Sequence, residues 1–437
     1  MPTAGRFDPG QPLPRRRCPD DARRSLVRLL LALPCAAALA GCAPRAGRDA
    51  ADVIVFRHAK LFGDPRALDA LIAGFEHDSG LRVRRETLPA SSDEQHLFYA
   101  INLQAHSAEF DVLALDVVWA AEFARAGWLR DLSGLLDARD RADLFPGALQ
   151  AATWTDRTYA LPWFVDAGLL YYRRDLLADD HLAVPDTWDE LTAAVRAVTA
   201  GAPELSGFVW QGKQYEGLVC NALEYVWSFG GAVPATGPDV AASVRALAFM
   251  RSLVTTGVSP PLVTTLTEEP SRVLFGRGGA VFLRNWPYAW QLFERAGSPV
   301  RGKVGVAPLP HAPGQPSVAA LGGWQLGVNA FSTRPLAAQR LVAFLASAPA
   351  QRALALAYGY SPPRRSLYTD PGLVAAQPFL ASLRTVFESA RPRPVSPYYV
   401  ALSQELQAQF SAVLTGRATP RSALAAVAAD AARLETM

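Results

Sequence analysis

The alternation of strand-like and helix-like segments is the feature that most restricts how this chain can fold. Strands that alternate with helical stretches favour an α/β sheet. Short apolar segments typical of strands are found at 52–56, 81–83 and 110–115, and segments with helical apolar spacing at 68–77, 187–200, 240–256, 335–357 and 401–432. Two further strand-like segments, 279–283 and 327–329, lie far along the chain, and the sequence does not show which sheet they join.

Length and composition agree with two α/β lobes. The chain has 437 residues, of which 50% are hydrophobic and 19% are charged, enough for a sizeable buried core in two or three domains. Its 34 prolines, 32 glycines and 10 tryptophans exclude a disordered chain, a collagen and a coiled coil. The net charge of +3 is concentrated before residue 42, which leaves a nearly neutral body without the basic surface of a nucleic-acid-binding protein.

Signatures of enzymes and metal sites are missing from the sequence. It contains no Gly-x-Ser-x-Gly, no P-loop, no His-Glu-x-x-His and no Gly-x-Gly-x-x-Gly that opens a helix. The six histidines are scattered without the spacing of metal ligands. We therefore expect no catalytic residues of these classes, no cofactor and no metal.

The N-terminus predicts export. Arg23, Arg24 and Arg28 precede an uncharged, mostly apolar run that ends at Ala40, the pattern of a signal peptide over residues 1–41. The run is too short to span a bilayer. Leu39-Ala40-Gly41-Cys42 resembles the lipobox of bacterial lipoproteins, which implies a lipid on Cys42 and a lipidated linker over 42–51. Arg23-Arg24-Ser25-Leu26 also resembles a twin-arginine export motif.

Removal of the signal and lipidation would leave Cys220 as the one remaining thiol, so we expect no internal disulfide. Cys220 lies in an apolar stretch with helical spacing, which favours a buried, inert side chain over a nucleophile.

Tryptophans beside glycine, proline and charged residues suggest a sugar site. Core tryptophans normally lie within regular apolar patterns, as we expect for Trp154, Trp188, Trp227 and Trp290. Four other segments place the indole at predicted strand-to-loop junctions, where it can face a ligand: 163–168, 210–217, 284–288 and 321–325. A pyranose stacks its C–H face on an aromatic ring and needs charged partners for its hydroxyls. For each of these tryptophans, core packing remains an equal alternative.

The same segments resemble the family 1 extracellular solute-binding proteins of ABC importers, and most closely the trehalose/maltose-binding branch. The resemblance is carried by 161–177, 211–224, 282–288, 321–326 and 391–397. It implies a periplasmic-binding-protein-like α/β fold with a cleft between two lobes joined by crossing hinge segments. The N-terminal lobe would comprise 52–160 plus about 305–345, and the C-terminal lobe 161–304 plus about 346–437.

Position by position, the resemblance implies a set of ligand-binding residues. Trp286 and Trp324 would stack on sugar rings, and Arg393 would donate hydrogen bonds to ring oxygens and hydroxyls. The full set is Asp116, Phe164, Asp166, Tyr215, Glu216, Trp286, Gly322, Gly323, Trp324 and Arg393.

Two of these assignments have structural alternatives, and two positions depart from the family pattern. Asp116 could instead cap the following helix, and Arg393 could form a salt bridge that locks its own loop. Residues 58–63 lack the acidic residue that the family often has there, and Phe164 replaces a frequent tyrosine. Both departures bear on which sugar is bound.

These observations predict a monomeric, lipid-anchored receptor on the extracytoplasmic face of a bacterial membrane. It would bind a trehalose- or maltose-like disaccharide by hinge closure and deliver it to the membrane subunits of an ABC importer. One alternative is a secreted glycoside hydrolase that uses two of Asp116, Asp166 and Glu216. Another is a receptor of the same fold for a different solute, such as a polyol, a sugar phosphate or a peptide.

Overall fold

The computed structural model describes residues 53–436, except 63, 90, 235, 236 and 238. The predicted signal peptide, the lipidation site at Cys42 and the linker lie outside the described residues.

The first sheet has six strands in the order β12-β11-β3-β1-β2, and β6 also pairs with β11. β1 runs parallel to β2 and β3, whereas β11 runs antiparallel to β3 and β6. Its strands are β1 (Val53–Ala59), β2 (Arg82–Leu88), β3 (Val112–Asp116), β6 (Ala160–Ala167), β11 (Ala320–Val328) and β12 (Arg391–Pro392).

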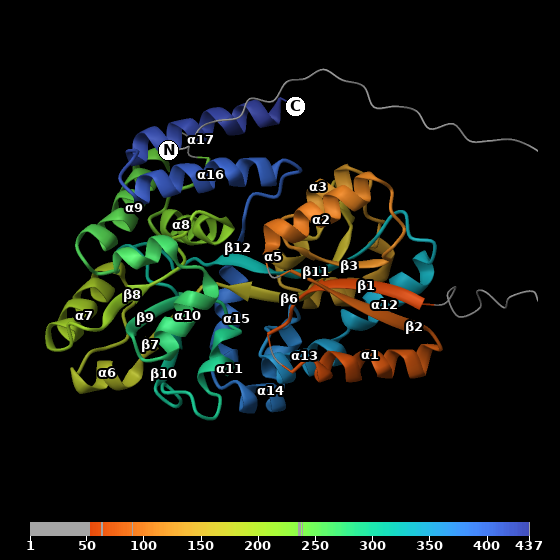
Figure 1. Cartoon of the computed structure of the whole chain (residues 1–437), viewed down its shortest axis with the longest axis horizontal. Helices are drawn as coiled ribbons and strands as arrows, with labels where there is room; N and C mark the ends of the chain where they lie inside the picture. The colour runs from red at the N-terminus through yellow and green to blue at the C-terminus, as the bar shows by residue number, and fades with distance from the viewer. Residues whose placement is uncertain (1–52, 63, 90, 235–236, 238, 437) are drawn as a thin grey trace, which may run out of the picture. The chain divides into compact units, whose positions relative to one another are not determined.

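Helices cover both faces of this sheet (Figure 1). Side chains alternate across a strand, so Ile54 and Phe56 of β1 point to one face and Val55 to the other. The first face packs against α1 (Arg66–Ser79), α12 (Pro335–Leu345) and α13 (Ala348–Tyr358), and the second against α2 (Ser92–Gln104) and α3 (Ala120–Arg125). Burial on both sides explains why the inner strand β3 is almost continuously apolar, whereas the edge strand β2 is largely charged.

The second sheet has four strands in the order β10-β7-β9-β8. β8 pairs in parallel with β9, and β7 runs antiparallel to β9 and β10. The strands are β7 (Leu169–Arg173), β8 (Ser206–Val209), β9 (Ala280–Asn285) and β10 (Val304–Ala307). Their side chains share a core with the helices α7 (Trp188–Gly201), α8 (Glu216–Ser228), α9 (Asp239–Thr255), α16 (Tyr399–Leu414) and α17 (Pro420–Glu435).

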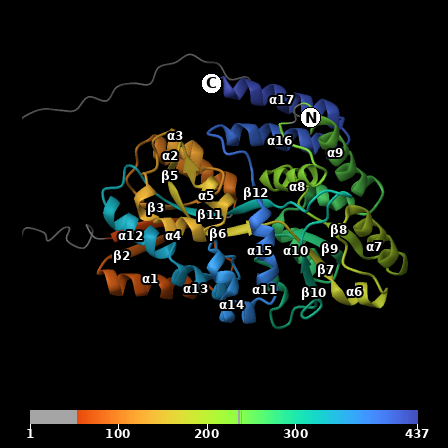
Figure 2. The same ribbon diagram turned by 180° about the vertical axis from the view of Figure 1, so that it is seen from behind.

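Shorter elements complete the described chain, and Figure 2 shows several of them from behind. They are η1 (Ser133–Leu135), α4 (Ala138–Asp143), α5 (Pro146–Ala151), β4 (Thr153–Trp154), β5 (Arg157–Thr158), α6 (Arg174–Asp179), η2 (Pro261–Thr265), α10 (Glu268–Gly276), α11 (Ala289–Phe293), η3 (Arg365–Thr369), α14 (Pro371–Ala376) and α15 (Leu380–Ser389).

The chain passes from the first sheet to the second at a single glycine. β6 ends at Ala167, β7 begins at Leu169, and Gly168 joins them. A Cβ atom at Gly168 would overlap with the carboxylate of Glu224, so only glycine fits this crossing. The chain crosses again between β10 and β11. Residues that follow β6 and β9 are thereby brought close to residues of β11.

Most of the expected elements are present, but two long helical patterns are each two helices. Residues 335–357 divide into α12 and α13 because Ser347 caps a new helix whose first turn contains Pro349. Residues 401–432 divide into α16 and α17, since Gly416 has φ +77° and Thr419 caps the next helix. No single helix among the described residues is long and apolar enough to cross a membrane. By length and composition alone, α12 and α13 together pass that test, with a 59° bend between them.

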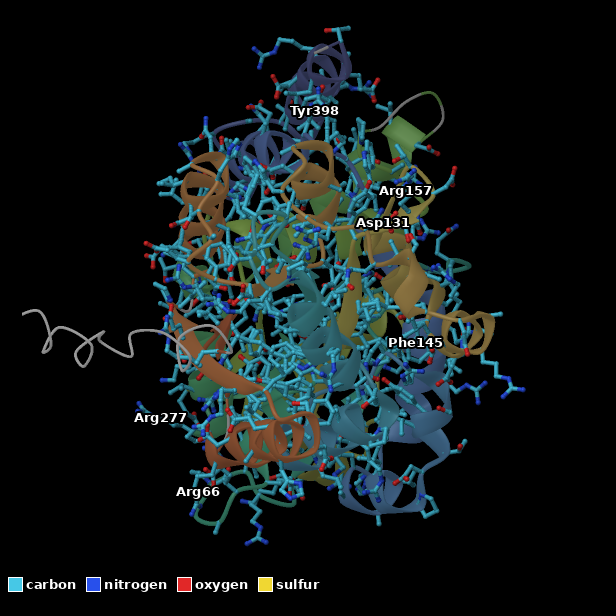
Figure 3. The ribbon with its side chains drawn as sticks, turned by 90° about the vertical axis from the view of Figure 1, so that its right-hand side faces the viewer. Arg66, Asp131, Phe145, Arg157, Arg277 and Tyr398 are labelled. Carbon is cyan, nitrogen blue, oxygen red and sulfur yellow. The ribbon has the colours of Figure 1, made fainter. Side chains whose placement is uncertain are left out.

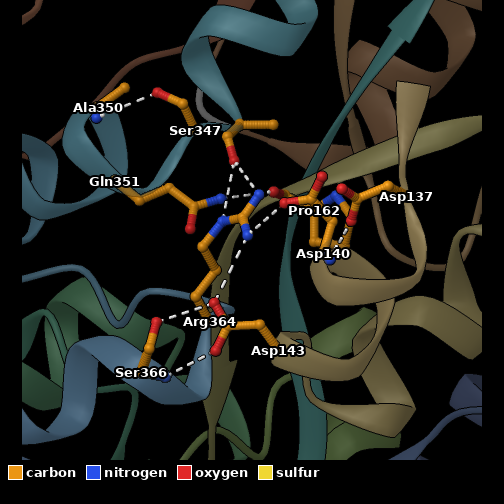
Figure 4. A network of polar contacts seen from close by, with 10 residues as sticks. Asp137, Asp140, Asp143, Pro162, Ser347, Ala350, Gln351, Arg364 and Ser366 are labelled. Carbon is orange, nitrogen blue, oxygen red and sulfur yellow. Dashed lines mark hydrogen bonds and ion pairs between the residues drawn. The ribbon is translucent and has the colours of Figure 1, made fainter.

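Arg364 joins three segments of the chain through a polar network (Figure 4). Its guanidinium donates to the Ala346 carbonyl at 3.1 and 3.3 Å and to Asp140 Oδ1 at 2.8 Å, and it lies 3.5 Å from Asp143. The network fixes the segment that follows Tyr360, a residue of the cavity described below. Surface pairs such as Arg157 and Asp131, 3.4 Å apart and labelled in Figure 3, are exposed and contribute little.

Candidate ligand-binding site

A cavity of about 610 Å³ is lined by strand residues of the first sheet on one side and by loops and helix starts next to the second sheet on the other. Each of the ten residues predicted to bind ligand lies on its wall. Asp116 ends β3, Phe164 and Asp166 belong to β6, and Trp324 lies in β11. From the other side, Trp286 directly follows β9 and Glu216 begins α8. The cavity therefore collects strand ends and loops that are far apart in the sequence.

Arg393 forms the centre of an ion-paired cluster on this wall. Its guanidinium donates to Glu216 Oε1 at 2.6 Å and to Asp116 Oδ1 at 3.0 Å. Tyr399 donates to Glu216 at 2.5 Å, and Ser403 donates to the other oxygen of the same carboxylate. Arg393 is only 3% exposed, and its Nε has no hydrogen-bond partner.

The structural alternative weighed for Arg393 is present in the geometry, because Arg393 makes the two salt bridges described above. The alternative for Asp116 is not: its carboxylate accepts a hydrogen bond from the Val118 backbone N–H at 3.2 Å, but the N-cap of α3 is Trp119 and no side chain caps that helix. Burial raises the pKa of Asp116, although the charge of Arg393 opposes that shift. These contacts coexist with a place on the cavity wall.

Asp166 is the carboxylate that lacks such support. Its Oδ1 atom is buried and has no hydrogen-bond partner. Burial raises the pKa of Asp166 to about 7, with Arg284 opposing the shift and Asp116 adding to it. A buried polar atom without a partner is costly, and a ligand hydroxyl would satisfy it.

The aromatic residues of the cavity are held by other rings and by a cation. Phe164 stacks on Tyr360 with ring centres 4.3 Å apart. Trp324 meets Trp119 edge to face at 5.8 Å. The Arg284 guanidinium lies 3.8 Å from the centre of the Trp286 ring. Aromatic residues supported from behind present flat, ordered surfaces to the cavity.

β11 approaches its neighbours closely at Gly322 and Gly323, and only at Gly323 does the backbone exclude any other residue. A Cβ atom at Gly322 would lie 3.2 Å from the Trp286 ring. Gly323 has φ +119°, and a Cβ there would overlap with the backbone of Phe164 and Val165. The pairing of β11 with β6 is irregular at this place, between Trp324 and Gln325.

Sequence reasoning missed the acidic pair at the start of α10. Glu268 accepts a hydrogen bond from Tyr215 at 2.8 Å, and Glu269 accepts one from Tyr288 at 2.8 Å. Both glutamates line the cavity, as do Lys60, Phe62 and Lys213. Acidic residues in a first helical turn are common, so their sequence pattern predicts a helix start and not a site. Phe62, from the loop after β1, stacks on Tyr288 at 5.2 Å.

The structure decides between the two alternatives for Trp210 and corrects the expectation for Trp154 and Trp290. Trp210 is fully buried, donates to Ser259 at 3.0 Å and does not line the cavity, because it packs in the core of the second sheet. Trp188 and Trp227 are buried as predicted, whereas Trp154 and Trp290 are only half-buried.

Cys220 is buried, as its sequence context predicts. It lies within α8 and is 2% exposed. Burial raises the pKa of its thiol to about 12, so the reactive thiolate is scarce at neutral pH.

Comparison with known proteins assigns a family to this fold and cavity. Residues 59–352 match the family model of the bacterial extracellular solute-binding proteins. The chain is 38% identical over 373 residues to a probable ABC transporter-binding protein of Deinococcus radiodurans, an alignment that covers 82% of this chain and 87% of the relative. It is 26% identical to the mannitol-binding protein of Pseudomonas aeruginosa, over 76% of this chain and 82% of that one. The solved structure of maltose-bound T. maritima MalE3 is 40% identical, with a TM-score of 0.81, over 87% of this chain and 99% of that one.

The chain belongs to the bacterial extracellular solute-binding protein family of ABC transporters. The predicted periplasmic-binding-protein-like fold is confirmed. The family and its structural neighbours are binding proteins and not enzymes, and membership of an extracellular family makes the chain an exported protein. Within the described residues, no group of three or more His, Cys, Asp or Glu side chains is arranged to hold a metal ion.

Proposed function

We propose that this protein is a receptor for a neutral disaccharide of the maltose or trehalose type. It presents the sugar to the membrane subunits of an ABC importer. The observation that carries the proposal is that Trp324 of β11 and Trp286, which directly follows β9 of the other sheet, line one cavity together with Asp166, whose buried Oδ1 has no partner. The two indoles offer planes for C–H faces, and Asp166 offers an acceptor for a hydroxyl. The likeness to maltose-bound T. maritima MalE3 supports the same class of ligand.

Closure of the two sides around a ligand follows from the positions of the site residues in the fold. The cavity residues come from the first sheet and from loops and helix starts next to the second, and Phe62 after β1 stacks on Tyr288 after β9. A ligand held by both sides binds a closed arrangement more tightly than an open one, and this difference drives closure. The importer would then recognise the closed form.

A polyol is the second candidate ligand. The relative in Pseudomonas aeruginosa is a mannitol-binding protein, and a linear polyol presents hydroxyls that the cavity carboxylates can accept. A polyol lacks a rigid apolar ring face, however, and gains less from two indole planes. A glycoside hydrolase is disfavoured, since the family and its neighbours bind their solutes without cleaving them.

Calorimetric titration with maltose, trehalose, sucrose, mannitol and ribitol tests the proposal. We expect a disaccharide to bind more tightly than either polyol. Tighter binding of mannitol or ribitol would replace the proposal with the polyol receptor, and release of glucose from maltose or trehalose would overturn the receptor. Trp290→Phe is the control for substitutions of the cavity tryptophans and should bind the same sugars as the wild type. Trp290 is a half-buried indole that does not line the cavity.

The export signals complete the proposal. A lipid on Cys42 would anchor a monomeric receptor on the extracytoplasmic face of the membrane. Mass spectrometry of the membrane fraction should find the mature N-terminus at an acylated Cys42. In a Cys42→Ser variant the acyl group and the membrane association should both be lost, and unchanged membrane association would contradict the anchor.

A further inference from the structure

Trp286 rests on a buried guanidinium. The Arg284 guanidinium carbon lies 3.8 Å from the centre of the indole ring, close enough for a cation–π contact. Arg284 itself is 1% exposed and does not line the cavity. One face of Trp286 is therefore covered by the protein, while the side chain forms part of the cavity wall.

Glu224 fixes the plane of this guanidinium. Arg284 Nε donates to Glu224 Oε2 at 2.8 Å, and Nη2 donates to Oε1 at 2.6 Å. The two side chains are 2% and 4% exposed. Nη1 donates to Gln211 at 3.2 Å, so each of the three guanidinium nitrogens has a partner. A bidentate pair with a third anchor holds a planar group in one orientation.

The same carboxylate is attached to the segments that cross between the sheets. Glu224 Oε1 accepts the backbone N–H of Ala320 at 3.1 Å, where β11 begins. The Gly168 crossing lies against Glu224 and Arg284 so closely that no Cβ fits. The support beneath Trp286 is thus built on the two crossings.

Other contacts of the indole are weaker. Its Nε1 lies 3.5 Å from Glu268 Oε1, at the limit of a hydrogen bond. Gly322 leaves room for the edge of the ring, but it makes no polar contact with the indole. Apolar side chains of both cores also pack against Trp286, and Arg284 is the charged group that covers a face of its ring.

We propose that Arg284 and Glu224 are positioning residues for ligand binding, which set the plane of Trp286 without touching the ligand themselves. The inference rests on the proposed function, in which Trp286 stacks on a sugar ring. It adds that affinity is controlled by a buried ion pair beneath the cavity wall.

A double-mutant cycle with maltose as the probe tests this role. Glu224→Gln/Arg284→Met removes both charges at once, because removal of one would leave the other buried and unpaired. We expect this variant to bind maltose about tenfold more weakly than the wild type. The cycle is measured with Asp166→Asn in every variant, because Arg284 also lowers the pKa of Asp166. In a Trp286→Ala background the same change should then alter binding by less than about twofold, because the ring through which the pair acts is gone.

A matched control separates positioning from general loss of stability. Arg173 at the end of β7 and Asp175 form a bidentate pair of the same geometry, at 2.7 and 2.5 Å, which is more exposed (10% and 29%), and neither residue lines the cavity. Arg173→Met/Asp175→Asn should leave maltose binding unchanged. An equal loss in this control, or the same loss with and without Trp286, would overturn the proposal.

A measurement without ligand keeps the two proposals distinguishable. The contribution of Trp286 to fluorescence is obtained by comparing each protein with its Trp286→Phe counterpart. We expect acrylamide to quench this contribution more strongly in Glu224→Gln/Arg284→Met than in the wild type or the control. Unchanged quenching would refute the positioning role, whereas a wild type that binds none of the sugars would refute only the proposed function.

A milder substitution covers the case in which the double variant does not fold. Arg284→Lys retains the charge but loses the flat guanidinium that meets the ring and the bidentate contact. It should weaken maltose binding and raise acrylamide quenching of Trp286. Wild-type values of both in Arg284→Lys would contradict the proposal.

Discussion

Arg284 and Arg393 are both buried and both bind carboxylates, but they lie at different distances from the cavity. Arg284 has one dedicated carboxylate, Glu224, and neither side chain lines the cavity. Arg393 divides its donors between Asp116 and Glu216, which line the cavity with it, and its Nε has no partner. An arginine whose donors are all paired, as in Arg284, suits a structural support. Arg393 still has one unpaired donor, so it can form a further hydrogen bond.

Asp166 represents the opposite extreme from Glu224. Glu224 accepts two hydrogen bonds from Arg284 and one from the Ala320 backbone, whereas Asp166 has a buried oxygen with no partner. Both are carboxylates in the same region of the fold. Pairing therefore separates a carboxylate that holds the structure from one whose buried oxygen can still accept a hydrogen bond.

The largest expected effect distinguishes the two arginines by stability. Arg284→Met should lower the free energy of unfolding by about 3–5 kcal/mol, because Glu224 would remain buried without its counter-charge. Arg393→Met should cost less, about 1–3 kcal/mol, since Asp116 and Glu216 are 15% and 14% exposed and Glu216 keeps its hydroxyl donors. Urea unfolding measures both values. Equal losses of unfolding free energy in the two variants would contradict the distinction between Arg284 as a structural support and Arg393 as a residue of the cavity.

The next effect concerns binding by the cavity tryptophans. Trp286→Ala and Trp324→Ala should each weaken maltose binding by roughly 30-fold, the scale of a dominant aromatic contact, and leave the fold intact. Trp210→Ala should instead lower the stability of the fold and leave the maltose affinity of the folded protein nearly unchanged, because Trp210 is a core residue and does not line the cavity. Calorimetry and thermal unfolding separate the two outcomes. Unfolding of both cavity variants would show that their indoles are core residues as well.

What the sequence predicted correctly depends on local patterns. The helix at 187–200 begins with Thr187 and Glu190, which form the reciprocal capping contacts that such spacing allows. Short apolar runs, buried on both sides, made β1 and β3 recognisable. Local chemistry of this kind is complete within a few residues, so it can be recognised without the fold.

What the sequence left open depends on contacts between distant segments. The strand signals at 279–283 and 327–329 belong to different sheets, β9 and β11, and only the crossings decide this. Trp210 and Trp286 have similar neighbours in sequence, yet one is in the core and the other lines the cavity. Glu268 and Glu269 reach the cavity because α10 packs beside β9. Such placements are tertiary facts that neither periodicity nor motif spacing contains.

The smallest expected effect tests Asp166 by pH. Its pKa is raised to about 7 by burial, so Asp166 is mostly protonated below that pH and ionised above it. If a ligand hydroxyl donates to the carboxylate, binding favours the ionised form, and maltose affinity should rise with pH through 7 and then level off. The change between pH 6 and pH 8 should be about tenfold. Calorimetry across this range measures it.

Asp166→Asn supplies the control, because its amide cannot titrate. The variant should bind maltose more weakly than the wild type at pH 8, with little dependence on pH.

The free energy of unfolding should change with pH in the direction opposite to that of the maltose affinity. A folded-state pKa above the ordinary value means that the folded protein holds the proton more tightly, so the Asp166 contribution to stability falls as pH rises between about 4 and 7. Asp166→Asn should remove that decline as well, and a pH profile of binding that persists in the variant would assign the titration to another cavity carboxylate such as Asp116.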